Sequence, residues 1–140
     1  MAAHKILRIV TRLNIGGPTI HAALLTAKLD PRRFATCLVV GESDPTEGDL
    51  TGRIDAGSAR LIRLASLRRP IRPWADALAL GQLVRLLWRE RPRLIHTHMA
   101  KAGTLGRLAG LLYNRWGPGR RPGARARLVH TFHGHVLSGY

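Results

Sequence analysis

Short apolar runs alternate with amphipathic segments along almost the whole chain, and this alternation constrains the fold more than any other feature. The runs, rich in Ile, Val and Leu, fall at residues 6–10, 36–40, 61–64, 94–97 and 127–132. Runs of this length are typical of strands buried on both faces of a parallel sheet. Strands separated by helices form right-handed βαβ units. The sequence therefore predicts an α/β fold, a Rossmann-like parallel sheet of about five strands with helices on both faces.

Three segments between these runs have helical periodicity. The second helix is expected to begin at Asp76 and to end before Pro92, and residues 68–73, with two prolines and three arginines, are expected to form a loop. A Gly-, Pro- and Arg-rich linker is expected at residues 117–125. The side chains predicted to face the core are Ile20, Ala23, Leu24 and Ala27 in the first helix, Leu80, Leu83, Val84 and Leu87 in the second, and Leu105, Leu108, Ala109 and Leu112 in the third.

Composition limits the classes of protein to consider. A chain of 140 residues, 45% of them hydrophobic, is long enough for one domain with a real core. No apolar stretch approaches the roughly 20 residues that a membrane-spanning helix needs. The single Cys37 cannot form an internal disulfide and is typical of a reducing compartment. The N-terminus has charges inside its apolar stretch, which is unlike a secretory signal.

The charge is strongly positive, with 23 Lys and Arg against 8 Asp and Glu. A net charge of +15 attracts polyanions such as nucleic acid, phosphorylated substrates or an anionic membrane surface. An arginine-rich but functionally neutral solvated surface is the alternative, since charge informs on partners and solubility and not on fold. Aromatic residues are only 5% of the chain, and no alternating aromatic and basic platform for stacking bases is visible.

Histidines follow two of the predicted strands. His96 and His98 end the run at residues 94–97, and His130, His133 and His135 end the last run. The carboxyl ends of parallel strands border the crevice in which α/β proteins bind ligands, so we expect both groups to face one cleft. We expect His96 and His130 to be half-buried and satisfied by neighbours, and His133 to be an exposed, working imidazole.

A metal site is not expected at these histidines, because no Cys or carboxylate joins them and their spacing matches no standard zinc motif. The sequence also lacks paired carboxylates for glycoside hydrolysis, a readable Ser-His-Asp set and a phosphate-binding G-x-x-x-x-G-K-[ST] loop. The dinucleotide pattern G-x-G-x-x-G does not occur, so NAD binding is not supported.

Two small-residue loops are candidate anion sites. Gly16, Gly17 and Pro18 lie between the first strand and the first helix, where the backbone and a helix N-terminus could meet a phosphate. The alternative is a plain turn. Lys101 follows the fourth strand at the start of the next helix and could bind an anionic group, or it could be a solvated lysine in a loop.

Four stretches, in this order and spacing, resemble a known family: LNIGGPTIHAALLTAKLD, LVVGESDPTEGDL, RERPRLIHTHMAKAGTLGRLAG and LVHTFHGHVLSGY. Together they are similar to the N-terminal half of bacterial family 4 glycosyltransferases, which have the GT-B fold. The resemblance covers nearly the whole chain. It implies one domain over residues 1–140, the acceptor-side half of a larger enzyme whose C-terminal nucleotide-sugar domain lies outside the chain.

The resemblance also implies a function. Such enzymes transfer a sugar from a nucleotide-sugar donor to a polysaccharide or lipid-linked acceptor, with retention and without a metal or other cofactor. Gly16 and Gly17 would approach the donor diphosphate, and His133 would be the active-site histidine. His98 and Lys101 would line the acceptor side. We expect a cytoplasmic protein, at the inner-membrane surface, with a complementing C-terminal domain and no transfer activity of its own.

Two alternatives remain at this stage. One is a basic α/β module that binds nucleic acid or another polyanion, supported by the charge alone. The other is an inert gene remnant whose uncovered last strand would be prone to association.

Overall fold

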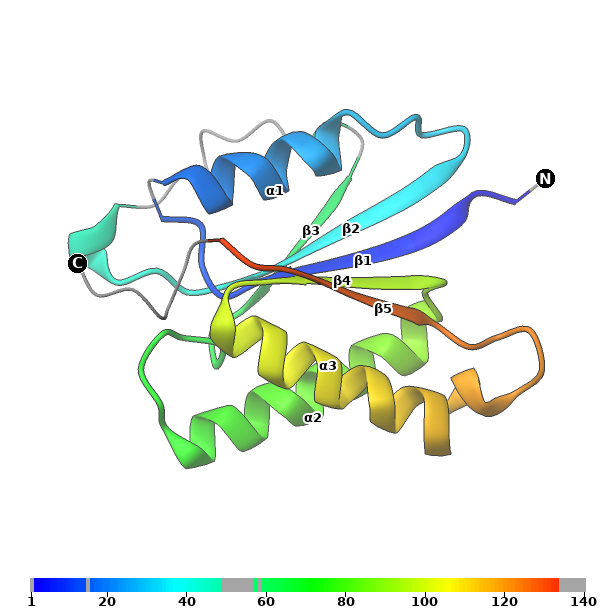
Figure 1. Cartoon of the computed structure of the whole chain (residues 1–140). Helices are drawn as coiled ribbons and strands as arrows, with labels where there is room; N and C mark the ends of the chain where they lie inside the picture. Colours follow the sequence, from blue (N-terminus) through cyan, green and yellow to red (C-terminus); the bar gives the residue numbers. More distant parts are fainter. Residues whose placement is uncertain (1, 15, 49–56, 58, 134–140) are drawn as a thin grey trace.

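A five-stranded, fully parallel sheet forms the centre of the molecule. The computed structural model describes residues 2–14, 16–48, 57 and 59–133. The strand order is β3-β2-β1-β4-β5 (Figure 1). The strands are β1 (His4–Val10), β2 (Phe34–Gly41), β3 (Arg60–Leu64), β4 (Leu94–His98) and β5 (Arg127–Thr131). All four pairings are parallel, so the carboxyl ends of the strands share one edge of the sheet.

Helices cover both faces of the sheet, as predicted. Helix α1 (Gly17–Ala27) lies on one face, whereas α2 (Pro73–Glu90) and α3 (Ala100–Trp116) lie side by side on the other (Figure 1). Short 3₁₀ turns occur at Pro45–Glu47 and Pro118–Arg120, the second of them inside the predicted linker. The α/β prediction is therefore confirmed. Among the described residues, no helix is both long enough and apolar enough to cross a bilayer.

Helix α2 begins three residues earlier than predicted. Pro73 is in its first turn, where the missing N–H costs nothing. Asp76 is also in the first turn, and its Oδ2 accepts a hydrogen bond from the backbone N–H of Arg72 (3.1 Å). Asp76 therefore does not mark the start of the helix. Its side chain caps the first turn from inside the helix.

The main core lies between the sheet and the α2–α3 layer. Leu83 and Leu87 of α2 are fully buried against Leu7, Ile9 and Ile95 of the sheet. A smaller core lies under α1 and contains Val10, Leu13, Ala22, Leu38 and Val40. The two faces of the sheet thus differ in how much apolar surface they bury.

The core-facing stripe predicted for α1 is wrong in two of its four positions. Ile20 and Leu24 are half exposed, and the buried face consists of Thr19, Ala22, Ala23 and Thr26. The reason lies in the sheet below, where the buried Arg8 donates from Nη1 to Thr26 Oγ1 (2.5 Å). A buried guanidinium needs hydrogen-bond acceptors, which a leucine face would not supply.

The stripe predicted for α3 is wrong at Leu108, which is exposed. Small residues form the buried face instead, namely Ala102, Gly103, Gly106, Ala109 and Gly110. A Cβ on Gly106 would lie only 2.5 Å from Thr97 Cγ2 of β4. The helix therefore approaches the sheet too closely for leucine on that face, and its leucines lie at the sides.

Candidate functional site

A crevice of about 420 Å³ opens at the carboxyl ends of the strands. It lies where α1 and α3 begin and where the chain leaves β5. Asn14, Pro18, Met99, Thr104, Phe132 and His133 are among its lining residues. Open parallel sheets bind ligands at this edge, outside the carboxyl ends of the strands. The two histidine groups and the glycine turn of the sequence thus meet at one place.

Two of the histidines are structural, as predicted. His96 is buried, shares a 2.7 Å hydrogen bond between Nε2 and Thr131 Oγ1, and accepts from Arg8 Nε at Nδ1 (3.4 Å). His130 is partly buried and shares a 2.9 Å hydrogen bond between Nδ1 and Thr97 Oγ1. Both side chains connect β4 to a neighbouring strand.

A hydrogen bond joins His98 and His133. Nδ1 of His98 and Nε2 of His133 are 2.9 Å apart. His98 is fully buried, and its Nε2 has no hydrogen-bond partner among the described residues. His133 is partly buried, not fully exposed as expected, because it packs on His98 with the ring centroids 5.2 Å apart. His135 lies outside the described residues.

His21 completes the cluster and was missed by the sequence reasoning. It lies in α1, and its ring centroid is 5.4 Å from that of His133 and 5.9 Å from that of His98. A usable signal was its position one turn after the glycine turn, since the start of α1 was already expected at the same crevice. Helical periodicity alone could not reveal it, because His21 does not belong to the buried face.

Burial favours the neutral form of four of the histidines at this end of the sheet, His96, His98, His130 and His133. Desolvation, followed by the charge of the nearby Arg8, lowers the pKa of His96 to about 4. Desolvation, followed by repulsion from His96, lowers the pKa of His98 to about 3. Burial likewise lowers the pKa values of His130 and His133. Neutral imidazoles each carry one donor and one acceptor nitrogen.

The bond between His98 and His133 couples their tautomers. When Nε2 of His133 donates to His98, the remaining Nδ1 of His133 is an acceptor, and when Nε2 accepts, Nδ1 is a donor. His133 lines the crevice, and its Nδ1 takes no part in the hydrogen bond with His98. The pair can therefore offer a ligand either a proton or a lone pair without a change in net charge.

His21, His98 and His133 are also the residues that could hold a metal ion. One ligand atom from each lies within 4.8 Å of the others. Zinc is commonly bound by imidazole nitrogens in tetrahedral geometry. Binding here would have to replace the hydrogen bond that already joins two of the three rings. The group contains no thiolate or carboxylate, and the expected absence of a metal stays a prediction.

The two glycines of the turn have open space at the position of a Cβ, and the turn borders the crevice through Pro18. Gly16 has an extended backbone (φ 171°), which any residue can adopt, and a Cβ there would meet only Pro18, at 3.8 Å. A Cβ on Gly17 would meet nothing within 4 Å. Packing within the described chain therefore does not require glycine at either position. The free space is compatible with a group that approaches from outside.

Lys101 is neither solvated nor free to bind an anion by charge alone. Its Nζ is 2.5 Å from Asp76 Oδ1 and also donates to the carbonyl of Pro70. These contacts tie the start of α3 to the start of α2. They border a second crevice of about 490 Å³, whose lining includes Ile71, Met99, Leu105 and Lys101. Met99, Ala100 and Thr104 line both crevices, so the two adjoin.

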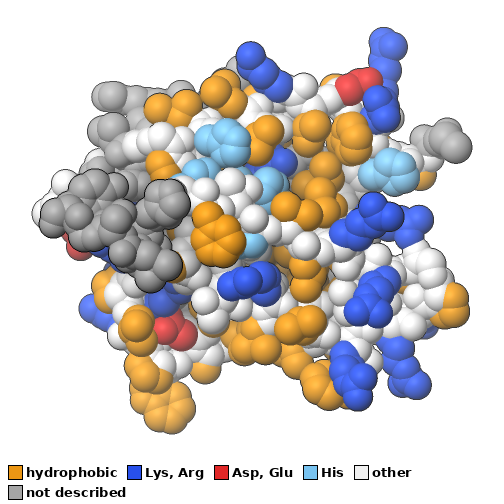
Figure 2. All heavy atoms as spheres, viewed as in Figure 1, with side chains coloured by type: hydrophobic (Ala, Val, Ile, Leu, Met, Phe, Trp, Pro, Cys, Tyr) orange, Lys and Arg blue, Asp and Glu red, His pale blue; other side chains and the backbone are white. Residues whose placement is uncertain are grey.

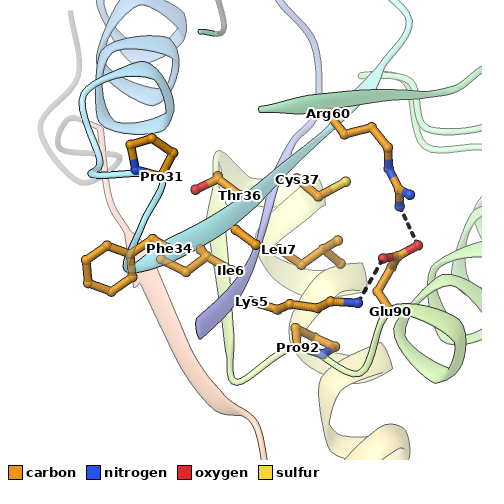
Figure 3. A pocket seen from close by; sticks show the side chains of 11 residues that line it. Lys5, Ile6, Leu7, Pro31, Phe34, Thr36, Cys37, Arg60, Glu90 and Pro92 are labelled. Carbon is orange, nitrogen blue, oxygen red and sulfur yellow. Dashed lines mark hydrogen bonds and ion pairs between the residues drawn. The ribbon is translucent and has the colours of Figure 1, made fainter. Parts of the chain in front are cut away.

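A separate pocket lies at the opposite edge of the sheet (Figure 3). It is lined by Lys5, Phe34, Cys37, Arg60 and Glu90, among others. Glu90 pairs with Lys5 and with Arg60, so the one carboxylate that lines this pocket is already engaged. The pocket is at the amino ends of the strands, away from the edge where parallel sheets bind ligands. We therefore assign the candidate site to the histidine crevice.

Comparison with known proteins agrees with the fold. A crystal structure of a protein assigned as a UDP-N-acetylglucosamine 2-epimerase from Listeria monocytogenes superposes with a TM-score of 0.65 at 16% sequence identity. The match covers 94% of this chain and 32% of that one, so the chain spans about a third of its length. At this identity, the likeness shows the fold alone.

Among curated protein sequences, none matches the chain. The family model described as a glycosyl transferase 4-like domain matches residues 16–140. The matched region contains the glycine turn, both histidine groups and all three helices. The chain therefore belongs to the glycosyl transferase 4-like domain family, in agreement with the resemblance noted in the sequence.

Proposed function

We propose that this chain is the acceptor-side half of a retaining glycosyltransferase that works at the cytoplasmic face of the inner membrane. Its reaction would transfer a sugar from a nucleotide-sugar donor to a polysaccharide or lipid-linked acceptor. One observation carries the proposal: the glycine turn, through Pro18, and His133 line a single crevice at the carboxyl ends of the strands. A donor held at the turn would bring its sugar close to His133.

Gly16 and Gly17 would accommodate the donor diphosphate. Their Cα atoms leave open space, and the first N–H groups of α1 have no partner inside the helix. Such N–H groups and the helix dipole favour a phosphate at this position. A side chain at either glycine would occupy the space that the diphosphate needs.

His133 would act on the transferred sugar or the acceptor through Nδ1. Its neutral state permits both donation and acceptance near pH 7. His98 is buried behind it, so in this conformation His98 would act by orienting His133 and not by touching the acceptor. Lys101 would border the acceptor crevice as a fixed hydrogen-bond donor whose charge is balanced by Asp76.

A second domain would supply the rest of the nucleotide-sugar site. Positioning two substrates across a cleft is worth about 7–11 kcal/mol in favourable cases, which half a cleft cannot provide. We therefore propose that the chain alone does not transfer sugar at a useful rate. The reaction would need no metal, since neutral imidazoles and backbone N–H groups supply the hydrogen bonds.

The test is a transferase assay on a protein that joins this chain to the coding sequence following Tyr140. Release of nucleotide from a panel of nucleotide sugars would be measured with and without EDTA. We expect turnover in both conditions, and a loss of about 10²–10⁴-fold in His133→Ala. His4→Ala is the matched control, because His4 is exposed at the amino end of β1. Equal rates in the two variants would refute the assignment of His133, and tight binding of nucleic acid without turnover would favour a polyanion-binding module.

A further inference from the structure

Three histidines from three separate elements, the histidine trio, meet beside the crevice. His21 lies in α1, His98 ends β4, and His133 follows β5. One ligand nitrogen from each lies within 4.8 Å of the others. Figure 2 shows histidine side chains gathered at the surface in the upper middle of the face drawn. The expectation that no metal binds here was based on two groups of histidines in the sequence, whereas the third member of the trio comes from α1.

The spacing of the histidine trio is close to that of three imidazoles around one ion. The ring centroids are 5.9 Å apart for His21 and His98, 5.4 Å for His21 and His133, and 5.2 Å for His98 and His133. With Zn–N distances of about 2.0–2.1 Å and tetrahedral angles, coordinated imidazole rings have centroids about 5 Å apart. The nitrogens that join His98 to His133 are 2.9 Å apart and would have to separate to about 3.4 Å. Small rotations of the rings would therefore close the trio on an ion.

The chemistry of the ligands selects the ion. Neutral imidazole is a good ligand for zinc, nickel and copper, whereas magnesium and calcium prefer oxygen ligands. The trio contains no carboxylate or thiolate, so its ligands do not compensate the charge of a bound ion. His133 lines the crevice, and the fourth position of a tetrahedral ion would be accessible to water there. The trio is therefore suited to zinc with an open coordination position.

Two features make such a site exchangeable and not structural. Histidines that bind zinc usually donate their other N–H to an oxygen acceptor. Nε2 of His98 is buried and has no hydrogen-bond partner among the described residues, so this support is missing. The guanidinium of Arg8 donates to His96, whose ring centroid is 4.2 Å from that of His98. Its positive charge opposes a cation, so zinc would bind less tightly than at a closed site of thiolates.

We propose that the histidine trio is an exchangeable zinc site, filled from solution and distinct from any metal that the reaction needs. Nδ1 of His98 and Nε2 of His133 would bind the ion in place of the hydrogen bond between them. Each neutral ring would keep its single proton, at Nε2 of His98 and at Nδ1 of His133, so no proton is released. Zinc would thereby fix His133 as a donor and remove its capacity to accept. The inhibition of sugar transfer that follows rests on the proposed function, whereas the binding of zinc does not.

The experiment is a titration of the 140-residue chain, without an affinity tag, with Zn²⁺ in competition with a chromogenic chelator. We expect about one ion bound per chain and no competition from Mg²⁺. His21→Ala should weaken zinc binding roughly tenfold or more, because His21 supplies one of the three ligands. His4→Ala is the matched control, since His4 is an exposed histidine at the other end of the sheet, and it should change the affinity less than about twofold.

Folding and geometry are checked separately. His21 is exposed, so without metal His21→Ala should have the melting temperature of the unchanged chain, and zinc should raise that temperature clearly more in the unchanged chain. Co²⁺ in place of zinc should give the intense visible bands of a tetrahedral ion. Equal zinc affinity in His21→Ala and the unchanged chain would overturn the proposal. The weak bands of octahedral Co²⁺ would overturn it too, since they indicate adventitious binding at the surface.

Sugar transfer is a third readout. In the protein joined to the coding sequence after Tyr140, Zn²⁺ should inhibit the release of nucleotide and EDTA should restore it. Failure of the 140-residue chain to bind zinc would overturn the zinc site and leave the proposed function intact. Transfer that zinc does not slow, in a protein that binds zinc through His21, would contradict the proposed role of His133 and not the zinc site. The two proposals can therefore fail separately.

Discussion

The two ends of the sheet are built on different principles. At the amino ends of the strands, the carboxylate of Glu90 is paired with Lys5 and Arg60. At the carboxyl ends, histidines cluster, one buried nitrogen of His98 has no hydrogen-bond partner among the described residues, and packing does not require glycine in the glycine turn. The first arrangement contributes modestly to stability, since solvent screens its ion pairs. The second accepts a cost in stability at the place where a ligand would bind.

The largest expected consequence of this difference is acid sensitivity. His96 and His98 have folded-state pKa values of about 4 and about 3, below the 6.5 of an unfolded histidine. Between these limits the unfolded chain binds more protons than the folded one. The contribution of these two histidines to the free energy of unfolding should therefore be complete above pH 6.5, fall by several kcal/mol as the pH drops to about 4, and level off below about 3.

Urea denaturation at a series of pH values would measure this effect. His96→Gln with His98→Gln should flatten the dependence, whereas His4→Gln, at an exposed position of the other end, should leave it unchanged. A profile that stays steep in the double variant would move the source of the acid sensitivity away from the carboxyl end.

The next prediction compares two glycines near the carboxyl ends of the strands, Gly103, which is closely packed, and Gly17, which is not. A Cβ on Gly103 would lie 2.4 Å from Cε1 of His130 and would push that ring from Thr97. Gly103→Ala should lower the free energy of unfolding by about 1–2 kcal/mol net, since overpacking outweighs the gain in helix propensity. Gly17→Ala, with open space at its Cβ, should leave stability unchanged and weaken donor binding. Denaturation with paired nucleotide-sugar titrations on the joined protein would show whether the two effects separate in this way.

The strands were predictable because buried parallel strands appear as unbroken apolar runs. The face of α1 was not, since its choice between Leu24 and Thr26 depends on Arg8, a residue of the sheet below it. For the same reason, the sequence singled out Asp76 and Lys101 separately but did not predict the ion pair between them. That pair joins the starts of two helices and spans 25 positions in the sequence. Local patterns predict elements, whereas the partners of polar groups emerge only when the elements pack.

A smaller effect should follow from replacing the unpartnered histidine. His98→Leu removes a buried imidazole whose Nε2 lacks a hydrogen bond and keeps a similar volume. We expect a gain of about 1 kcal/mol in stability at pH 7, because a buried, unsatisfied polar atom is costly. In the joined protein, turnover should fall, since His133 loses the group that orients it. A loss of stability would show that the carboxyl end is as well packed as the amino end.

The smallest effect is expected at the amino end, although three of the ion pairs among the described residues meet there, all at Glu90. Glu90 is largely shielded, but its partners Lys5 and Arg60 are more than half exposed, so water and salt screen the pairs. Glu90→Gln should lower the free energy of unfolding by less than about 1 kcal/mol, and the difference from the unchanged chain should shrink as salt is added. Denaturation at low and high ionic strength measures this directly. A loss that is large and insensitive to salt would instead mean that Glu90 acts as a buried structural charge. The two ends of the sheet would then differ only in the kind of buried polar group, a carboxylate at one end and imidazoles at the other.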